Sequence, residues 1–494
     1  MIKALYRENL SLLTDLYQLT MGYGYWKKGM AERRACFQLF YRKPPFTGDR
    51  GIICAGLQPV CEVLDHFQLS VSDIQYLGSL RGADQRPLFN ESFLNYLQRM
   101  EFSCDIQAIP EGTFVLPHCP IVRVEGPLLQ VQLIETLLLN MINFSSLIAT
   151  KAARIRQAAG TDPVLEFGLR RAQGPNGALL ATRSAYIGGV DGTSNVLAGK
   201  LLGIPVKGTH AHSWVMSFPS EMEAFQAYAE GQPNNVILLV DTYDTLQGVK
   251  NAIRVAKELQ KEGQRLLGIR LDSGDLAHLS KKARQLLDEA GLFETKIVAS
   301  NDLDEYRIAE LKEQGAQIDT WGIGTRLITS FDRPALGGVY KLSAIQNEAG
   351  EWESKMKYSN DQIKRSNPGI INPLRVQTED SLYVDVLYNE LQGSWEKEAV
   401  DPQTGANLPL SIKGINPLLT SIYRKGSRIY SFPTIHTIRQ KSLESWKNQK
   451  VFISDQVLHS PSLWMQKQEF KQPLNDENTG SPTGQKASNK TAFN

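Results

Sequence analysis

The pattern of apolar and polar positions predicts alternating strands and helices across the middle of the chain. Six short apolar runs have the length and composition of buried strands: Val164–Phe167, Ile204–Val206, Val236–Val240, Leu266–Leu271, Ile297–Ala299 and Ile318–Ile323. Segments with helical periodicity separate them: Ser184–Leu202, Glu221–Ala229, Leu246–Glu262, Leu276–Ala290 and Leu303–Gln314. This alternation predicts an α/β fold with parallel strands and helices outside them. Six or more such units favour a TIM-like barrel over an open sheet, although periodicity alone does not close it.

The pattern changes on both sides of this region. Leu10–Trp26 is a helical start with Thr14 or Asp15 as its cap. Leu128–Ala159 is long and apolar and predicts a buried pair of helices. Beyond about residue 345 the predicted strands are shorter and lack intervening helices. We therefore expect an N-terminal α/β domain at 1–130, a barrel-like catalytic domain at 131–345, and an α+β segment at 346–471 that packs on the N-terminal domain. The polar tail 472–494 has the composition of a disordered segment.

Composition and charge exclude several classes of protein. The 494 residues are 42% hydrophobic and 21% charged, as expected of a globular enzyme of two or three domains. The net charge of +2 arises from 54 basic and 52 acidic residues, without the basic footprint of a nucleic-acid binder. We find neither a signal peptide nor an apolar run of roughly 18 residues that would span a membrane. The five cysteines form no CxxC pair, which favours reduced, buried thiols in a cytoplasmic protein.

Polar and charged side chains gather where the predicted strands end, and in parallel α/β folds this edge binds ligands. In chain order these residues are Arg170, Arg171, Thr209, His210, His212, Asp241, Thr242, Asp244, Arg270, Asp272, Ser273, Gly274, Ser300, Asn301, Gly322, Gly324 and Thr325. Arginines bind anions, the Gly-x-Gly-Thr loop offers backbone N–H groups to a phosphate, and carboxylates can hold Mg²⁺ together with substrate phosphates. Taken singly, each group also fits a turn, a helix cap or a solvated pair. Together they predict a site for a polyanionic sugar phosphate.

Two histidines lie close together in this inventory. His210 and His212 straddle Ala211, and on an extended segment that spacing sends the two side chains to opposite sides. At most one of them therefore faces a given site, and the pair is a poor metal chelate.

At this point the residues carry a family resemblance. The chain resembles the nicotinate phosphoribosyltransferases, which are type II phosphoribosyltransferases. The motifs that carry the resemblance appear in family order: TDLYQLTMGYGYW (14–26), EFGLRR (166–171), GGVDGTSNV (188–196), GTHAHS (208–213), DTYDT (241–245), RLDSGDL (270–276), SNDLDE (300–305), GIGTRL (322–327) and LGGVYKL (336–342). Beyond residue 345 only a loose piece matches, Lys364–Gly369, with Ser366 where the family usually has threonine.

The resemblance implies an enzyme of NAD biosynthesis. It would combine nicotinate and 5-phosphoribosyl 1-pyrophosphate into nicotinate mononucleotide and pyrophosphate, with Mg²⁺ as cofactor and ATP as co-substrate. It also implies a cytoplasmic homodimer with shared sites, and an irregular α/β barrel beside a second domain built from both chain ends.

The resemblance further implies roles for single residues. His212 matches the histidine that ATP phosphorylates. Phe167, with Tyr17 of the neighbouring subunit, would sandwich the pyridine ring. Residues that match the surroundings of the base, the ribose and the substrate anions are Arg170, Arg171, Ser194, Thr209, Arg270, Asp272, Ser273, Gly274, Ser300 and Asn301. Gly322, Gly324 and Thr325 match the 5′-phosphate loop. Asp241 and Asp244 are candidate Mg²⁺ ligands through the substrate phosphates.

Three alternatives stay open. Nicotinamide phosphoribosyltransferase shares this fold and the phosphohistidine, but it has aspartate where Ser194 stands here, and the missing charge favours nicotinate. A non-catalytic barrel that only binds ligand would have no need of a nucleophile at His212. A sugar-phosphate aldolase or epimerase is disfavoured because no obvious Schiff-base lysine lies at a strand end.

Overall fold

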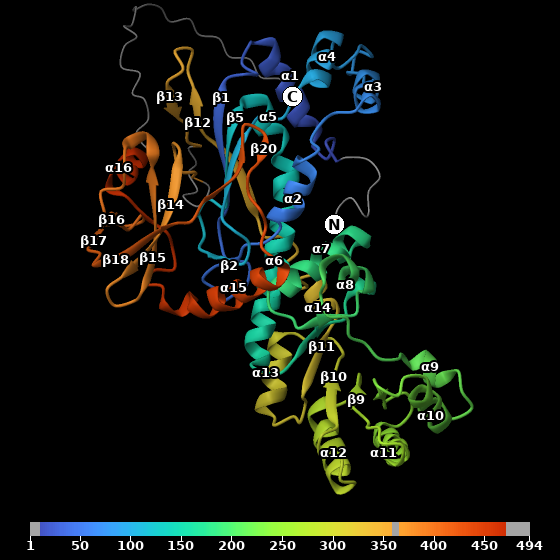
Figure 1. The fold of residues 1–494 in the computed structure, drawn as a ribbon. Coiled ribbons are helices and arrows are strands. Elements are labelled where there is room, and N and C mark those ends of the chain that lie inside the picture. Colours follow the sequence, from blue (N-terminus) through green and yellow to red (C-terminus); the bar gives the residue numbers. More distant parts are fainter. Residues whose placement is uncertain (1–9, 358–364, 471–494) are drawn as a thin grey trace, which may run out of the picture.

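The structure is a computed structural model that describes residues 10–357 and 365–470. The predicted disorder of 472–494 therefore lies outside the described residues. Three sheets of six or seven strands and one two-stranded pair, β2 (Ile52–Ile53) with β4 (Phe114–Val115), form the framework. In Figure 1 the antiparallel strands occupy the upper half and the parallel strands β9, β10 and β11 the lower half. The α/β fold class predicted from the sequence is confirmed.

The parallel sheet is the core of the predicted catalytic region. Its strands lie in the order β7-β6-β11-β10-β9-β8, with β6 at Val164–Glu166, β7 at Gly192–Thr193, β8 at Ile237–Leu239, β9 at Gly268–Leu271, β10 at Lys296–Ala299 and β11 at Thr320–Ile323. All five neighbouring pairs are parallel. Their carboxyl ends therefore meet at one edge, as the sequence predicts.

The barrel itself is not observed as a closed sheet. Among the described residues no ladder joins the edge strands β7 and β8. The run Ile204–Val206, predicted as a strand, contributes only a single parallel bridge between Val206 and Thr193. The predicted helix at 184–202 is instead two helices, α7 (Gly174–Ile187) and α8 (Val196–Leu202), with β7 between them. Helix α7 begins ten residues before the predicted helix, at Gly174, and Pro175 is tolerated in its first turn.

Two of the helices after β8, α11 and α12, have both a capping residue at the start and an apolar face along their length. Helix α11 (Thr245–Lys261) begins after Asp244, whose side chain accepts the Gln247 N–H, and Asp275 caps α12 (Leu276–Glu289) in the same way. Each helix buries an apolar face against the sheet. The remaining helices of this region are α9 (His212–Met216), α10 (Glu221–Gly231), α13 (Glu305–Glu313) and α14 (Thr325–Ile328).

The seven-stranded antiparallel sheet combines segments from both ends of the chain. Its order is β13-β12-β1-β5-β3-β19-β20, with β1 at Arg34–Tyr41, β3 at Asp105–Ala108, β5 at Val122–Pro127, β12 at Gly338–Gln346, β13 at Trp352–Ser354, β19 at Thr420–Arg424 and β20 at Ser427–Arg428. The boundary expected at residue 345 falls inside β12, which pairs with β1. The chain therefore returns to this sheet before that boundary. Helices α1 (Leu16–Lys27), α2 (Leu57–Leu64), α3 (Val71–Ser79) and α4 (Glu91–Arg99) belong to the same half (Figure 1).

The third sheet belongs to the C-terminal part. Its order is β17-β16-β21-β15-β14-β18, with β14 at Ile371–Thr378, β15 at Tyr383–Asn389, β16 at Ala399–Val400, β17 at Asn407–Leu408, β18 at Ile412–Pro417 and β21 at Leu458–His459. Helix α16 (Pro461–Glu469) packs on β15, β16 and β21, whereas α15 (Ile435–Asn448) packs on α7 and on the β2–β4 pair.

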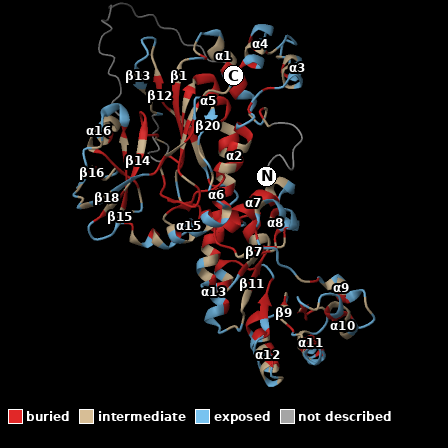
Figure 2. Ribbon diagram, in the orientation of Figure 1, coloured by how far each residue is buried: buried red, intermediate tan, exposed pale blue. Residues whose placement is uncertain are grey.

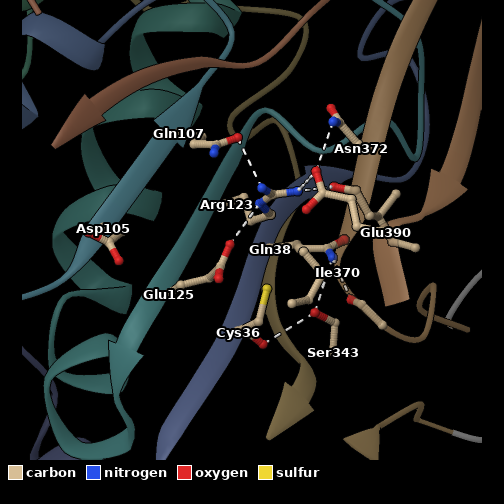
Figure 3. Close-up of polar contacts among 12 residues, drawn as sticks. Cys36, Gln38, Asp105, Gln107, Arg123, Glu125, Ser343, Ile370, Asn372 and Glu390 are labelled. Atoms are coloured by element: carbon tan, nitrogen blue, oxygen red, sulfur yellow. Dashed lines mark hydrogen bonds and ion pairs between the residues drawn. The ribbon is translucent and has the colours of Figure 1, made fainter. Parts of the chain in front are cut away.

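A buried arginine joins this sheet to the seven-stranded one. Arg123 on β5 donates to the Ile371 carbonyl at 3.2 Å, to Glu390 at 3.0 Å and to Gln107 at 3.1 Å (Figure 3). Gln38 on β1 donates to Ser343 and to the Gly369 carbonyl, each at 3.0 Å. These contacts fix the C-terminal part against the N-terminal sheet.

Helices α5 (Leu128–Leu133) and α6 (Glu135–Ala159) are the predicted buried pair. The stretch Leu128–Ala159 is long and apolar enough to cross a membrane, contrary to our reading of the sequence, but 67% of its most apolar window is buried by protein. Helix α6 packs on α2 and β2 in one half and on α7 and α13 in the other (Figures 1 and 2). It is therefore a core helix that links the two halves. All five cysteines are free and buried, as predicted.

Candidate active site

A hydrogen-bonded group of three side chains lies at the carboxyl ends of β9 and β10. The Arg270 guanidinium donates to Ser300 Oγ at 2.8 Å and to Asp272 Oδ1 at 3.0 Å, and the Ser300 hydroxyl also donates to Asp272. Burial alone would raise the pKa of Asp272, but these hydrogen bonds and the charge of Arg270 hold that pKa below its ordinary value. The site therefore contains a fixed carboxylate next to a fixed guanidinium.

The two acids of the DTYDT motif have different surroundings. Asp241 is buried, and its Oδ2 accepts from the Asp272 backbone N–H and from the Ser273 hydroxyl, both at 2.7 Å. Its Oδ1 is buried without a hydrogen-bond partner. Asp244 instead caps α11, with Oδ1 accepting the Gln247 N–H at 2.7 Å. Asp241 Oδ1 therefore has no partner at this edge, and the cap of α11 uses only one of the two Asp244 oxygens.

The two histidines of the GTHAHS motif lie in different environments. His210 is buried, its Nε2 accepts the Leu239 N–H of β8 at 3.1 Å, and its ring packs edge-on to Tyr228. Burial lowers the pKa of His210 to about 4, so the ring is neutral, as acceptance at Nε2 requires. His212 is the first residue of α9, and 40% of its side chain is exposed. Its Nε2 lies 3.6 Å from Asp272 Oδ2 and its Nδ1 lies 3.2 Å from Thr242 Oγ1. Of the two, only His212 approaches the Arg270–Asp272 group.

An aromatic ring lies beside the same group. Phe167 follows β6, and its backbone N–H donates to the Ile323 carbonyl at 2.7 Å. The Arg270 guanidinium carbon is 5.8 Å from the Phe167 ring centroid. Gly322 on β11 makes room for the ring, because a Cβ at that position would lie 2.7 Å from two of its carbons. The ring and the guanidinium can therefore receive a flat, anionic ligand.

Glu166 is a structural residue of the site to which the sequence analysis gave no role. Its buried carboxylate accepts from the Thr193 hydroxyl at 2.6 Å, from the Thr182 hydroxyl at 3.0 Å and from the Gly168 N–H. It thereby holds β7, α7 and the turn after Phe167 together. Burial raises the pKa of Glu166 above its ordinary value. Its place at the end of an apolar run, just before Phe167, is the one sequence signal that marks it.

The expected phosphate loop connects β11 to α14. Gly322 packs against the Phe167 ring as described above. Gly324 precedes α14, and Thr325 is the first residue of that helix. Arg170 and Arg171 form a short 3₁₀ turn after Phe167, are exposed, and have no polar partner among the described residues. Asn301 is exposed and has a φ of 99°, in the region that disfavours side chains. This face of the site therefore presents free guanidinium groups and a strained turn.

The remaining predicted residues are distributed as follows. The Ser194 N–H donates to the Glu166 carbonyl at 2.9 Å, so Ser194 lies next to β6. Thr209 is half-buried in the loop before His212, and Gly274 has a φ of 77° in the turn that caps α12. Tyr17 is exposed on α1, in the half of the molecule away from the parallel sheet (Figure 1). Tyr17 and Phe167 of the same chain therefore lie in different halves of the structure.

The residues of this site could hold Mg²⁺ only if bound phosphates supplied the remaining ligands. Within residues 10–357 and 365–470 no group of three or more His, Cys, Asp or Glu side chains has the geometry to hold a metal ion. Asp241 Oδ1 has no hydrogen-bond partner, and Asp244 accepts its cap hydrogen bond through Oδ1 alone. Because Mg²⁺ is commonly held by one or two carboxylates plus substrate phosphates, this edge suits such an ion.

Comparisons with known proteins find similar proteins over most of the chain. Residues 12–143 match the nicotinate phosphoribosyltransferase (NAPRTase) N-terminal domain, and residues 163–389 match the NAPRTase family. The chain is 43% identical over 442 residues to nicotinate phosphoribosyltransferase of Bacillus subtilis (strain 168), covering 88% of each. It is 36% identical over 486 residues to that of Homo sapiens, covering 86% of this chain and 88% of the relative. The crystal structure of human nicotinic acid phosphoribosyltransferase superposes with a TM-score of 0.80 at 32% identity, covering 92% of this chain and 99% of that one.

Proposed function

The chain belongs to the nicotinate phosphoribosyltransferase family, and on that premise we propose how its residues join nicotinate to phosphoribosyl pyrophosphate in NAD salvage. The enzyme transfers the phosphoribosyl group to nicotinate and releases pyrophosphate. One observation carries the residue-level proposal. Successive contacts connect the Phe167 ring to the Arg270 guanidinium, Arg270 to Asp272, and Asp272 to His212 at the end of the parallel sheet.

The pyridine ring of nicotinate lies on Phe167, and its carboxylate faces the Arg270 guanidinium. Ser300 and Asp272 hold this guanidinium in place, so the base is oriented before the reaction begins. The ring nitrogen then attacks C1 of the ribose. The bond from C1 to the diphosphate oxygen breaks, and its electron pair leaves with pyrophosphate. Arg170 and Arg171, free of partners among the described residues, supply positive charge for the substrate anions.

The 5′-phosphate lies at Gly322, Gly324 and Thr325, and the ribose lies by Thr209, Ser273, Gly274, Ser300 and Asn301. Mg²⁺ bound with the diphosphate would be held by Asp241 and would neutralise the leaving group. Asp244, whose Oδ1 caps α11, is the second candidate ligand through its other oxygen.

His212 accepts the γ-phosphoryl group of ATP. With its proton on Nε2 facing Asp272, the imidazole keeps a lone pair on Nδ1, next to the Thr242 hydroxyl. This lone pair attacks the γ-phosphorus, the bond to the bridging oxygen breaks, and ADP leaves with the electron pair. Water later attacks the phosphorus and releases phosphate. The phosphohistidine places negative charge beside the diphosphate region while it lasts.

Three further features complete the proposal. The enzyme is a homodimer in which Tyr17 of one subunit covers the Phe167 ring of the other, since Tyr17 is exposed and away from its own parallel sheet. The parallel sheet is an irregular barrel whose edge strands β7 and β8 are connected through the segment that contains Val206 and His210. Val206 bridges to β7, and His210 accepts an N–H of β8. The free, buried cysteines suit the cytoplasm.

Base choice separates this proposal from a nicotinamide-specific relative. Ser194 is half-buried next to Glu166 and brings no charge of its own to the base site.

Nicotinate and nicotinamide should be offered in parallel with phosphoribosyl pyrophosphate, with and without ATP, and the mononucleotide measured. We expect nicotinate to be the better base and ATP to stimulate the reaction. Ser194→Asp should weaken nicotinate use by on the order of 1–3 kcal/mol through carboxylate repulsion. Unchanged nicotinate kinetics in Ser194→Asp would remove Ser194 from the base site.

A further inference from the structure

A buried cluster of charges lies behind the site, between helix α6 and two of the site loops. Lys151 on α6 is fully buried, with 0% of its side chain exposed. Its Nζ is 2.7 Å from Glu305 Oε2 and also pairs with Asp332. A buried ammonium group is costly unless it is paired, so these two carboxylates account for its presence.

The two carboxylates come from different loops of the site. Glu305 is the first residue of α13, which follows the loop from β10 that contains Ser300 and Asn301. Asp332 follows α14, whose first residue is Thr325 of the expected phosphate loop. Lys151 on α6 therefore joins the segment after β10 to the segment after β11.

Arg326 on α14 repeats this connection. Its Nη1 is 3.5 Å from Asp304 Oδ2, in the loop after β10, and 3.8 Å from Asp332 Oδ1, beyond its own helix. Its guanidinium also lies over the Phe331 ring at 4.4 Å. Two cations and three carboxylates thus link the same two loops.

Arg154, one turn along α6, fixes the orientation of the shared carboxylate. Its Nε is 2.7 Å from Glu305 Oε1, and it also pairs with Asp49. Glu305 is held on one oxygen by Arg154 and on the other by Lys151, and its side chain is 7% exposed. It cannot rotate away from Lys151 without breaking a buried ion pair.

We infer that Lys151 and Arg326 are positioning residues that clamp the loop after β10 to the loop after β11 and so set the spacing between the ribose and 5′-phosphate ends of the phosphoribosyl pyrophosphate site. This inference rests on the proposed placement of the 5′-phosphate at Gly324 and Thr325. Neither residue is expected to touch substrate. Without Lys151, Glu305 keeps Arg154 and Asp332 keeps only the 3.8 Å contact with Arg326. No single cation then bridges the two carboxylates, and their repulsion weakens the link between the loops.

The test is a comparison of steady-state constants in purified, folded variants. Lys151→Met keeps the length of the side chain without its charge. Its KM for phosphoribosyl pyrophosphate should rise about 10-fold, whereas the KM for nicotinate should change less than about twofold. Arg326→Gln, at a side chain that is 33% exposed, should fold readily and show a smaller rise of the same kind. Adding Asp332→Asn to Lys151→Met removes the repulsion, and the double variant should recover part of the loss.

Arg375→Met is the matched control. Arg375 pairs with the buried Asp385 at 2.8 Å between β14 and β15, in the third sheet. This variant should lose stability without a change in either KM. The inference is overturned if Lys151→Met and Arg326→Gln keep the parent KM for phosphoribosyl pyrophosphate, or if Arg375→Met raises it as much as they do. A failure of the proposed site is separate: Thr325→Ala with the parent KM would remove the 5′-phosphate from this loop.

Discussion

At the scale of single residues, His210 and His212 show how two identical side chains take different roles. The His210 imidazole accepts the Leu239 N–H, so it bridges the segment before α9 to the edge strand β8. Acceptance at Nε2 requires the neutral ring, and burial supplies that state by lowering the pKa of His210 to about 4. His212 lies half-exposed against Asp272 and Thr242. The first histidine therefore supports the fold and the second is available for chemistry.

The role of His210 predicts a pH dependence of stability. Its folded pKa is below the usual value of about 6.5 for an unfolded chain, so its contribution is complete above pH 6.5 and is lost as the pH falls towards 4. His210→Gln keeps an acceptor for the Leu239 N–H but does not titrate. We expect the melting temperature of the parent to fall more steeply than that of His210→Gln between pH 6.5 and 4. His118 and His459 titrate equally in both proteins. Parallel curves for the two would contradict this role.

Residue roles were predictable from the sequence only in part. The spacing of His210 and His212 predicts that they face different ways, because that follows from local backbone geometry. Asp241 and Asp244 look equivalent in the sequence, yet one supports the loop of Asp272 and the other caps α11. Glu166 carried only the signal of its place at the end of an apolar run, because its three partners come from segments that only the fold brings together.

At the scale of elements, the ends of β6 and β11 fit together through a glycine. Phe167 follows β6, and Gly322 on β11 leaves the space that its ring fills. Gly322→Ala would place a methyl group 2.7 Å from the ring and move it off the proposed nicotinate position. We expect the KM for nicotinate to rise by about 10-fold, or about 1.4 kcal/mol, with a smaller effect on phosphoribosyl pyrophosphate.

Gly231→Ala is the control for this substitution. Gly231 ends α10, and a Cβ there would meet nothing within 4 Å. Its kinetic constants should match those of the parent. A nicotinate KM that is equally unaffected in Gly322→Ala would mean that the ring does not hold the base.

Strands and helices with strong periodicity were predicted well, and short elements were not. The strands β8 to β11 lie at the predicted apolar runs. The helices α11 and α12 lie where a capping residue precedes a segment of helical periodicity. Strand β7 has two residues, Gly192 and Thr193, which form no pattern that periodicity can detect. The run Ile204–Val206 has the composition of a strand, but it makes a single bridge. Because the closure of a barrel depends on such edge segments, the sequence could not decide it.

At the scale of the whole molecule, the aromatic-rich helix α1 and the parallel sheet lie in different halves (Figure 1). Tyr17 is 47% exposed, and Leu16 and Met21 beside it are exposed as well. A second subunit would cover this apolar face and receive Tyr17 at its own Phe167 ring. The proposed site therefore needs a second copy of the chain to supply Tyr17.

Subunit mixing tests this shared site. Tyr17→Ala and His212→Ala subunits should each be impaired as homodimers. A mixed dimer contains one site with both defects and one site with neither. Random mixing should therefore restore about one quarter of the parent activity, because half of the dimers are mixed. Verified subunit exchange without any gain in activity would place both residues in the site of a single subunit.

The central claim is that His212 receives the γ-phosphoryl group of ATP beside the base-binding ring. The most direct measurement is incubation of the parent, His212→Ala and His210→Ala with γ-labelled ATP, followed by detection of acid-labile, base-stable phosphate on the protein. The parent and His210→Ala should be labelled, and His212→Ala should not. His212→Ala should still form nicotinate mononucleotide slowly, without stimulation by ATP, because phosphorylation drives the reaction but does not make the new bond. Full labelling of His212→Ala would contradict the claim and transfer the role to another side chain.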